Sequence, residues 1–449
     1  MDIDTLRDRI HADMPRVIDE LSRLVAIPSV AHDGYEPARV RESAALTRDL
    51  LAEAGADARL LEMTGGPPAV FAEWPAGGDG PTVLLYAHHD VQPAATPGDW
   101  ATDPFAPEVR DGRLYGRGAA DDKSGIVTHA AALRALAGEE LACTVKVVVE
   151  GEEEYSAEHL PELVQGNAEL LRADVALIAD GGNYRTGYPT VGTSVRGAHQ
   201  LDVRVDVLPS AQHSGSFGGP LPDAAMSLAR MIASLHDDAG NVAVGGLRSF
   251  TWEGTPVEEA DFRAESGVFP EVQLIGSGTL ADRTLAQPSI NVLAFDAPRM
   301  HEVANQIVPT ASAAIGVRLA PGEDGPAAVA KVADHLRAAA PWGVRVTIRG
   351  DAEAPGKGHL VDTTTEAHRV AEGALRDAFD HEVAAMGSGG SIPLVAMLAD
   401  TFPGIAVLIT GAGDDRSNYH SIDESVDLAD LERMIVFEAV FLTRLGATR

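Results

Sequence analysis

The sequence has few of the features that mark disulfide-stabilised, membrane-spanning or nucleic-acid-binding proteins. Its 449 residues include one cysteine, so no disulfide can form within the chain. No apolar stretch approaches the roughly 18 residues that a membrane-spanning helix requires. Lys and Arg number 35 against 67 Asp and Glu, a formal net charge of −32, whereas phosphate groups are bound by positive charge. We therefore expect neither nucleic acid nor a membrane surface among its partners.

The N-terminus lacks the pattern of a targeting segment. It begins Met1-Asp-Ile-Asp, without the basic residues and following apolar core of a secretory signal. Cys143 stands in a strand-like apolar segment, where a free cysteine is usually a small buried side chain. These observations predict a cytoplasmic protein.

Hydrophobic patterning divides the chain into three stretches. A chain of 449 residues exceeds the usual size of a single core, so two domains are expected. In residues 1–196, short apolar runs alternate with helical stretches, which predicts an α/β fold with a mostly parallel sheet and helices on both faces. In residues 197–352, apolar and polar positions alternate, which predicts a smaller antiparallel α+β lid domain. Residues 353–449 return to the first pattern and are expected to complete the first, catalytic domain.

Polar residues with metal-binding side chains stand next to strand-like apolar runs. In parallel sheets, ligands gather beyond the carboxyl ends of the strands. Imidazole nitrogen and carboxylate oxygen without thiolate suit Zn²⁺, Mn²⁺ or Co²⁺, and a carboxylate can bridge two such ions roughly 3.5–4 Å apart. The sequence therefore predicts a site for two metal ions, with the ligands His88, Asp121, Glu154, Asp180 and His420.

His88 and Asp90 are two positions apart after the apolar run that ends at Tyr86. On an extended backbone such residues point to the same side, so Asp90 can accept a hydrogen bond from the ring nitrogen of His88 that does not bind metal. His89 faces the other way, and we expect no metal role for it. Asp90 is thus predicted to orient His88.

Three consecutive glutamates, Glu152, Glu153 and Glu154, follow another strand-like run. Their charges repel one another unless a cation lies among them. The three carboxylate ligands nearly neutralise two divalent ions and leave about one positive charge for a hydroxide to balance. Glu153, beside a ligand but outside the ligand set, is predicted to take a proton from the metal-activated water and to deliver it to the leaving amine.

These motifs resemble those of the M20 metallopeptidase family, which includes carnosinase-like dipeptidases, carboxypeptidase G-like enzymes, aminoacylases and succinyl-diaminopimelate desuccinylases. The resemblance covers nearly the whole chain. Family members carry their metals on His-x-Asp, Gly-Arg-Gly-x-x-Asp-Asp-Lys-Gly, Glu-Gly-x-Glu-Glu and a late His. The matching segments are Tyr86-Ala-His-His-Asp-Val-Gln-Pro93, Gly116-Arg-Gly-Ala-Ala-Asp-Asp-Lys-Ser-Gly125, Glu150-Gly-Glu-Glu-Glu154 and Asn418-Tyr-His-Ser-Ile-Asp-Glu424.

The resemblance implies how the ligands are shared. His88, Asp121 and Asp180 would hold one ion, and Asp121, Glu154 and His420 the other, with Zn²⁺ preferred over Mn²⁺ or Co²⁺. Asp121 would bridge both ions and would be joined to the next residue by a cis peptide bond, as in family members.

Lid and loop segments also match the family and imply a substrate site. His213, in a His-Ser-Gly motif, would reach the scissile carbonyl, often in the neighbouring subunit of a homodimer. Arg318 would hold the substrate carboxylate. The loop around Gly389, Gly390 and Ser391 would wrap that carboxylate with backbone N–H groups.

The resulting prediction is a di-metal dipeptidase that cleaves dipeptides or very short peptides by a metal-activated water, with Glu153 as general base. An amidohydrolase of the same family acting on N-acyl amino acids is an alternative. A catalytically silent homologue is disfavoured because every ligand and the base are present. Tyr155-Ser156-Ala157 departs from the Gly-Ser that family members usually have there, which leaves the side-chain preference open.

Overall fold

The computed structural model describes residues 2–74, 80–94, 97–350 and 356–446, and its contacts divide the chain into two compact units. Unit 1 contains Met1–Thr193, Val361–Met386 and Ile392–Arg449. Unit 2 contains Ser194–Leu360 and Gly387–Ser391. The predicted boundary between 196 and 197 lies close to the first division, and the one between 352 and 353 lies outside the described residues.

The short segment Gly387–Ser391 was predicted to lie in the catalytic domain, but it belongs to unit 2. The Arg196 backbone N–H donates to the Gly390 carbonyl oxygen at 2.9 Å. Gly387 packs so closely against Ser194 and Trp252 that a Cβ there would lie 2.6 Å from the Ser194 hydroxyl. These contacts, made by residues distant in sequence, attach the loop to unit 2.

The largest sheet has the strand order β1-β2-β6-β3-β7-β17-β8-β15, with β16 beside β8. Its centre is parallel, because β3 pairs in parallel with β6 and β7, and β17 pairs in parallel with β7. Antiparallel strands flank that centre on both sides. The strands are β1 (Asp57–Leu61), β2 (Ala69–Trp74), β3 (Thr82–His88), β6 (Thr144–Glu150), β7 (Val175–Ile178), β8 (Thr190–Val195), β15 (His359–Leu360), β16 (Ala384–Ser388) and β17 (Ala406–Ile409).

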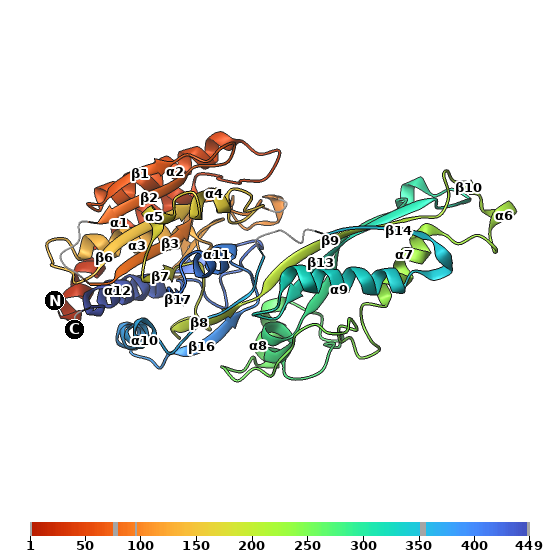
Figure 1. Ribbon diagram of the computed structural model, residues 1–449. Helices are drawn as coiled ribbons and strands as arrows, with labels where there is room; N and C mark the ends of the chain where they lie inside the picture. Colours follow the sequence, from red (N-terminus) through yellow and green to blue (C-terminus); the bar gives the residue numbers. More distant parts are fainter. Residues whose placement is uncertain (1, 75–79, 95–96, 351–355, 447–449) are drawn as a thin grey trace. The chain divides into compact units, whose positions relative to one another are not determined.

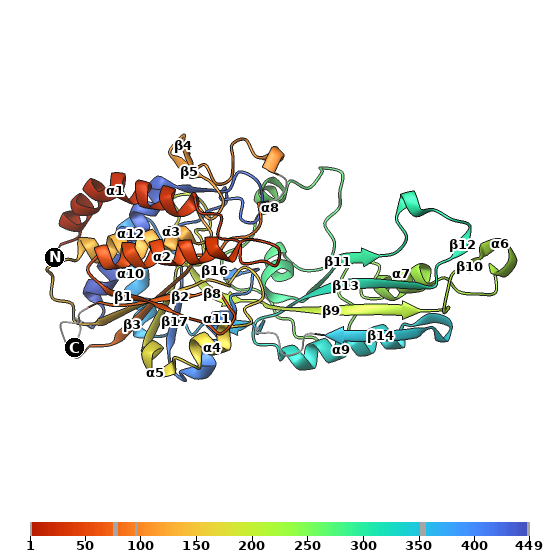
Figure 2. The same cartoon turned by 90° about the horizontal axis from the view of Figure 1, so that it is seen from above.

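Helices cover both faces of this sheet in unit 1. In Figure 2, α1, α2, α3, α10 and α12 lie on one side of the sheet, and α4, α5 and α11 lie on the other. Apolar side chains on α1, α3 and α12 pack together with the strand valines and leucines in one core. The helices are α1 (Ile3–Val25), α2 (Pro37–Glu53), α3 (Lys123–Ala135), α4 (Leu160–Val164), α5 (Ala168–Leu171), α10 (Glu366–Phe379), α11 (Pro393–Thr401) and α12 (Leu428–Arg444).

A second, three-stranded sheet in unit 1 joins segments that are far apart in the chain. Its order is β18-β5-β4, with β4 (Glu108–Arg110), β5 (Arg113–Tyr115) and β18 (Ser425–Asp427). The pairing of Ser425 with Tyr115 brings the C-terminal segment beside the glycine-rich segment that follows β5.

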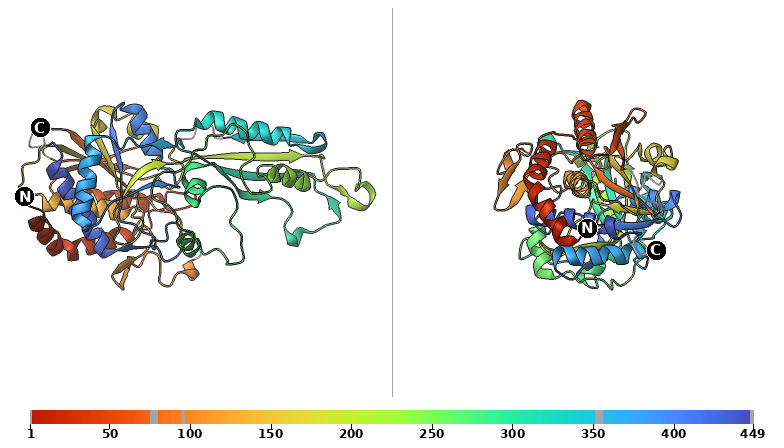
Figure 3. Two further views of the ribbon diagram at one scale, coloured as in Figure 1. Left: turned by 90° about the horizontal axis from the view of Figure 1, so that it is seen from below. Right: turned by 90° about the vertical axis from the view of Figure 1, so that its left-hand side faces the viewer.

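Unit 2 is built on a four-stranded antiparallel sheet of order β11-β13-β9-β14. Alternate side chains of β9 and β13 are buried under α7 and α9, which run along the strands (Figures 1 and 3). The elements are β9 (Gly197–Asp206), β10 (Gln212–His213), α6 (Ser214–Phe217), α7 (Ala224–Ala233), α8 (Glu259–Ser266), β11 (Ser289–Asp296), β12 (Gln306–Ile307), β13 (Thr310–Leu319), α9 (Gly325–Ala338) and β14 (Arg345–Gly350).

The α/β fold with helices on both faces of its main sheet is as predicted, and the structure adds the antiparallel strands at the sheet's edges. No helix in the described part of the chain is both long enough and apolar enough to cross a membrane.

Candidate metal centre

Three of the predicted ligands come from neighbouring strands of the main sheet. His88 is the last residue of β3, Asp180 follows β7, and Glu154 follows β6. Because β3 pairs in parallel with both β6 and β7, the carboxyl ends of these strands meet at one edge of the sheet. The strand order therefore gathers side chains that lie in three separate sequence motifs.

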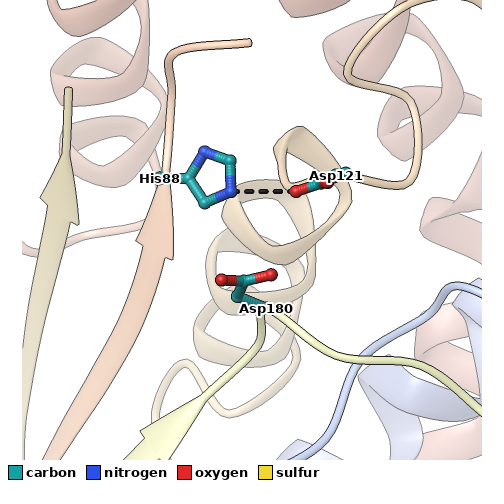
Figure 4. Close-up of side chains that lie close together, drawn as sticks. All are labelled: His88, Asp121 and Asp180. Carbon is teal, nitrogen blue, oxygen red and sulfur yellow. Dashed lines mark hydrogen bonds and ion pairs between the residues drawn. The ribbon is translucent and has the colours of Figure 1, made fainter. Parts of the chain in front are cut away.

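Asp121 lies in the glycine-rich segment before α3. Gly118 in that segment has φ +83°, a conformation that L side chains rarely adopt, and a Cβ there would lie 2.6 Å from Val91. The peptide bond from Asp121 to Asp122 is cis, as the family resemblance implied. Figure 4 shows the Asp121 carboxylate facing the His88 ring, with Asp180 beside both.

His420 follows β17 in a loop of unit 1 and completes the set. Its Nε2 lies 3.0 Å from Asp121 Oδ2 and 3.0 Å from Glu154 Oε2. The other oxygen of Asp121, Oδ1, lies 2.9 Å from His88 Nε2. Each oxygen of one carboxylate thus faces a different histidine, which is the geometry that a bridging ligand needs.

The five side chains form two overlapping groups that share Asp121. Within each group the possible ligand atoms lie within 4.8 Å of one another. One group is His88, Asp121 and Asp180, and the other is Asp121, Glu154 and His420. These are the groups that the family resemblance implied.

Burial and mutual repulsion shift the pKa values of these groups strongly. Burial, followed by the charge of Asp121, raises the pKa of Asp180 to about 7. Burial and the Asp121 charge also raise the pKa of Glu154, although His420 opposes them. Burial alone would lower the pKa of His420, but its contacts with Asp121 and Glu154 raise it to about 10. The site therefore concentrates carboxylates that a cation would stabilise.

The donor set fits divalent metal ions. In the described residues, two imidazoles and three carboxylates converge, and such nitrogen and oxygen ligands suit Zn²⁺, Mn²⁺ or Co²⁺. These side chains would hold metal ions in their deprotonated forms, through imidazole nitrogens and carboxylate oxygens.

Asp90 has a broader set of contacts than the sequence predicted. His88 Nδ1 lies 3.1 Å from the Asp90 backbone oxygen and 3.5 Å from its carboxylate Oδ1. The Asp90 carboxylate accepts the backbone N–H groups of Glu153 at 3.2 Å and Glu154 at 3.0 Å. One fully buried aspartate therefore lies against the His88 ring and fixes the backbone of both glutamates.

Glu153 belongs to neither group of possible ligands. Burial, followed by the charge of Asp180, raises its pKa well above the ordinary value. The assignment of Glu154 as a ligand and Glu153 as the base stays a prediction.

Sequence reasoning missed Gln92. Its Nε2 donates to the Glu154 backbone oxygen at 2.8 Å and to Glu154 Oε2 at 2.9 Å. A sequence signal existed, because Gln92 stands two positions after Asp90 and four after His88, where an extended backbone would place all three side chains on one side.

The remaining predicted residues lie in unit 2. His213 is exposed in β10, and its Nδ1 accepts the Ser216 backbone N–H at 3.1 Å, which caps α6. Arg318 lies in β13 opposite Ala198 of β9. In the loop, the Gly390 N–H donates to the Ser388 hydroxyl at 3.0 Å, while Gly389 is exposed and Ser391 half-buried.

Comparison with known proteins identifies the family. The profile of peptidase family M20/M25/M40 matches residues 84–444. The chain belongs to this family. It is therefore a metallopeptidase, and the resemblance inferred from its motifs is confirmed.

Two curated relatives match almost the whole chain. The cysteinylglycine-S-conjugate dipeptidase of Corynebacterium striatum is 38% identical over 96% of each chain. The β-Ala-His dipeptidase of Homo sapiens is 27% identical over 96% of this chain and 86% of its own length.

Solved structures share the fold. The di-peptidase Dug1p from Saccharomyces cerevisiae matches with a TM-score of 0.84 at 21% identity, covering 99% of this chain and 98% of its own. Human carnosine dipeptidase 1 matches with a TM-score of 0.81 at 24% identity over 98% of both chains. These likenesses confirm the predicted fold class of this M20 peptidase.

Proposed function

We propose that this M20 enzyme hydrolyses the peptide bond of dipeptides and very short peptides, using two divalent metal ions held by the two groups around Asp121. The observation that supports this most directly is the placement of Asp121 Oδ1 and Oδ2 against His88 and His420, at 2.9 and 3.0 Å. Similarity to two curated dipeptidases over nearly the whole chain supports the substrate class.

The proposed ligand sets are His88, Asp121 and Asp180 for one ion, and Asp121, Glu154 and His420 for the other, with Zn²⁺ as the preferred metal. When bound, such ions polarise the scissile carbonyl and make water a stronger nucleophile near neutral pH. Asp90 holds the backbone of Glu153 and Glu154, and Gln92 holds the Glu154 carboxylate, so the chain supplies a rigid frame for the ligands.

Glu153 is the proposed general base and acid. It accepts a proton from the attacking water and delivers that proton to the amine that leaves. Burial and nearby carboxylate charges raise its pKa above the ordinary value, which favours the uptake of a proton.

Residues of unit 2 are proposed to recognise the substrate. Arg318 would pair with the C-terminal carboxylate, and His213 would contact the scissile carbonyl. Arg196, buried in the same unit, is close enough to Arg318 that burial and the Arg318 charge lower the Arg196 pKa to about 10. A guanidinium such as that of Arg318 suits a carboxylate. The Arg196 guanidinium donates to the Thr284 and Gln287 carbonyl oxygens at 3.0 and 2.6 Å, and its backbone N–H donates to the Gly390 carbonyl oxygen.

We also propose that the enzyme is a homodimer. Strand β11 is an edge of the unit 2 sheet and exposes Val292, Leu293 and Phe295, which are 46%, 60% and 45% exposed. An apolar edge strand of this kind is a liability in a monomer and a ready surface for pairing with a second copy.

The named relatives direct the choice of substrates. One acts on cysteinylglycine S-conjugates and another on β-Ala-His, according to their names. We therefore propose dipeptides with a free C-terminal carboxylate, Cys-Gly and its S-substituted forms among them. Hydrolysis of N-acyl amino acids is not favoured, since no relative described above carries such a name.

The deciding experiment is a hydrolysis screen of the purified enzyme with added Zn²⁺, Mn²⁺ or Co²⁺. Cys-Gly, an S-substituted Cys-Gly and β-Ala-His would be compared with N-acetyl and N-succinyl amino acids. We expect dipeptide cleavage that a chelator abolishes and added metal restores. Cleavage of the N-acyl amino acids alone, or full activity without metal, would contradict the proposal.

A further inference from the structure

A buried glutamate outside the proposed ligand set contacts the segment that carries Asp121. The Glu424 side chain is fully buried, and its carboxylate accepts four hydrogen bonds. Arg117 Nη1 and the Gly118 N–H donate to Oε2 at 2.6 and 3.0 Å. The N–H groups of Ala120 and Asp121 donate to Oε1 at 3.0 and 3.1 Å. We call these five residues the Glu424 network.

The hydrogen bonds of the Glu424 network offset the free-energy cost of burying the Glu424 carboxylate. One guanidinium and three backbone N–H groups satisfy it, so both carboxylate oxygens are held. Because one donor is the backbone N–H of Asp121 itself, any shift of the Glu424 carboxylate would shift the residue whose two oxygens face His88 and His420.

Glu424 is also tied to the segment that carries His420. The Gly116 N–H donates to the Glu424 carbonyl oxygen at 2.9 Å, and Arg117 Nη2 donates to the Ser421 carbonyl oxygen at 3.0 Å. Asp121 and His420 are 299 positions apart in the sequence. The contacts around Glu424 therefore join the segments that carry two of the three members of the second ligand group.

The backbone near His420 contains left-handed residues. Asn418, His420 and Asp423 have φ of 54°, 56° and 55°, a region that residues other than glycine seldom adopt and that Asn, Asp and His enter more readily than most. Conformations of this kind persist only where the surrounding contacts fix them. Glu424 follows directly after the last of these residues.

We propose that Glu424 is a positioning residue, which sets the Asp121 carboxylate between His88 and His420 and thereby determines metal affinity. This inference rests on the proposed role of Asp121 as a shared ligand. Glu424 touches neither substrate nor metal in this account, and it acts through the backbone of residues 118–121 and through Arg117.

The test is Glu424→Gln, which keeps the size of the side chain but removes its charge and one acceptor oxygen. The matched control is Glu438→Gln. Glu438 is equally buried in α12, and its Oε2 lies 2.8 Å from His129 Nδ1, away from the metal ligands. Both variants lose one buried charge, but only the first alters the side chain that accepts the Asp121 backbone N–H.

Metal affinity would be measured by competition with a chromophoric chelator, and kcat and KM would be measured separately. We expect Glu424→Gln to bind metal about 10–100-fold more weakly, the range found when a partner of a metal ligand is removed. At saturating metal, kcat should fall while KM changes little, because substrate contacts are unaltered. Glu438→Gln should keep the metal affinity of the wild type.

If Glu424→Gln does not fold, Glu424→Asp serves the same purpose. It keeps the charge that balances Arg117 but is one methylene too short to reach all three N–H groups, so weaker metal binding is expected again. Wild-type metal affinity in a folded Glu424 variant would overturn the inference alone. A wild-type enzyme that binds no metal would overturn the proposed function, and the inference with it.

Discussion

The two units handle charge in different ways. In unit 1, whole ion pairs are buried. Arg113 and Asp414, whose side chains are 2% and 0% exposed, form two hydrogen bonds of 2.7 and 2.8 Å. In unit 2, Arg204 and Asp206 also pair, but their side chains are 54% and 33% exposed.

The units also differ in how far their large apolar side chains are exposed. Unit 2 exposes large ones, among them Phe269 at 71% and Met300 at 88%, in addition to the edge strand β11. The predicted metal ligands of unit 1 lie among buried networks that fix them from several sides. This contrast agrees with the proposals that unit 1 holds the metal ligands and that unit 2 contacts the substrate and a second copy.

The strongest test of unit 1 as a complete centre is Asp121→Ala. Because this carboxylate faces both histidines, we expect both ions to be lost and turnover to fall by more than the roughly 10²–10⁴-fold that removal of a general base causes. Metal content by elemental analysis and dipeptide hydrolysis would be measured together. Retention of two ions would show that Asp121 is not shared.

Replacing Glu153 with Gln separates chemistry from metal binding. Turnover should fall by about 10²–10⁴-fold while metal content stays near that of the wild type. Glu152→Gln is the matched control, because the Glu152 carboxylate instead accepts from the Ser156 hydroxyl and lies 2.9 Å from His159 Nδ1. Its turnover should change far less. Loss of metal from Glu153→Gln but not from Glu154→Gln would reverse the two assignments.

The difference between buried and exposed ion pairs predicts a difference in stability. Asp414→Asn should lower the free energy of unfolding by about 3–5 kcal/mol, because it removes the carboxylate that forms two hydrogen bonds with the buried Arg113 and leaves the more distant Asp427 carboxylate, 3.7 Å from Arg113 Nη1, as charge partner. Asp206→Asn should cost less than about 1 kcal/mol. Urea unfolding of the metal-free protein at neutral pH, followed by circular dichroism, checks both values. Equal effects would contradict the comparison.

The buried pair Arg113–Asp414 also predicts how the stability of the protein depends on pH. Burial alone would raise the pKa of Asp414, but the hydrogen bonds and charge of Arg113 outweigh it and lower the pKa below its ordinary value of 3.8. A lowered pKa in the folded state means that the stabilisation is present above the ordinary value and is lost as the pH falls through the folded value. The difference in the free energy of unfolding between the wild type and Asp414→Asn should therefore become smaller as the pH falls into the acid range, as urea unfolding at a series of pH values would measure.

Unit 2 is tested through the substrate carboxylate. We expect free dipeptides to be cleaved better than their C-terminal amides, and Arg318→Ala to reduce that preference by about 10–100-fold, the value of a charge-assisted hydrogen bond. Arg204→Ala on the neighbouring strand is the control, and it should keep the preference. An enzyme that cleaves amides and free dipeptides equally would remove this role for Arg318.

The smallest expected signal comes from mixing two inactive variants, His213→Ala and Glu153→Ala. If His213 completes the site of a partner subunit, mixed dimers contain one intact site. Statistical exchange would then restore about a quarter of the wild-type activity. Absence of recovery after subunit exchange verified by mass spectrometry would place His213 within its own chain's site, or outside the reaction.

Several features of the fold and site could be predicted because they depend on local pattern. Apolar runs such as Val83 to Tyr86 specify buried parallel strands, and a polar residue directly after such a run falls at the sheet edge where ligands gather. This is how His88, Glu154 and Asp180 could be identified. The predicted partition of ligands into two groups came from the family resemblance, and the geometry of the described residues agrees with it.

Other features depended on contacts that no local pattern contains. The assignment of Gly387–Ser391 to unit 2 follows from its contacts with Ser194, Arg196 and Trp252. The hydrogen bonds from the backbone N–H groups of Glu153 and Glu154 to Asp90, and from Gln92 to the Glu154 carboxylate, are likewise tertiary contacts.

By itself, the sequence determined which side chains of a metal-binding type follow which strands, and it led to the prediction that one further carboxylate acts as a base. Those properties reside in residue type and in short-range periodicity. The tertiary structure decided how His420 reaches Asp121, a pairing that only the family resemblance had implied: β18 pairs with β5, and the buried Glu424 carboxylate holds the backbone of residues 118–121. Pairing between distant segments depends on burial and hydrogen bonding across the whole fold, and the pattern of one segment does not contain that information.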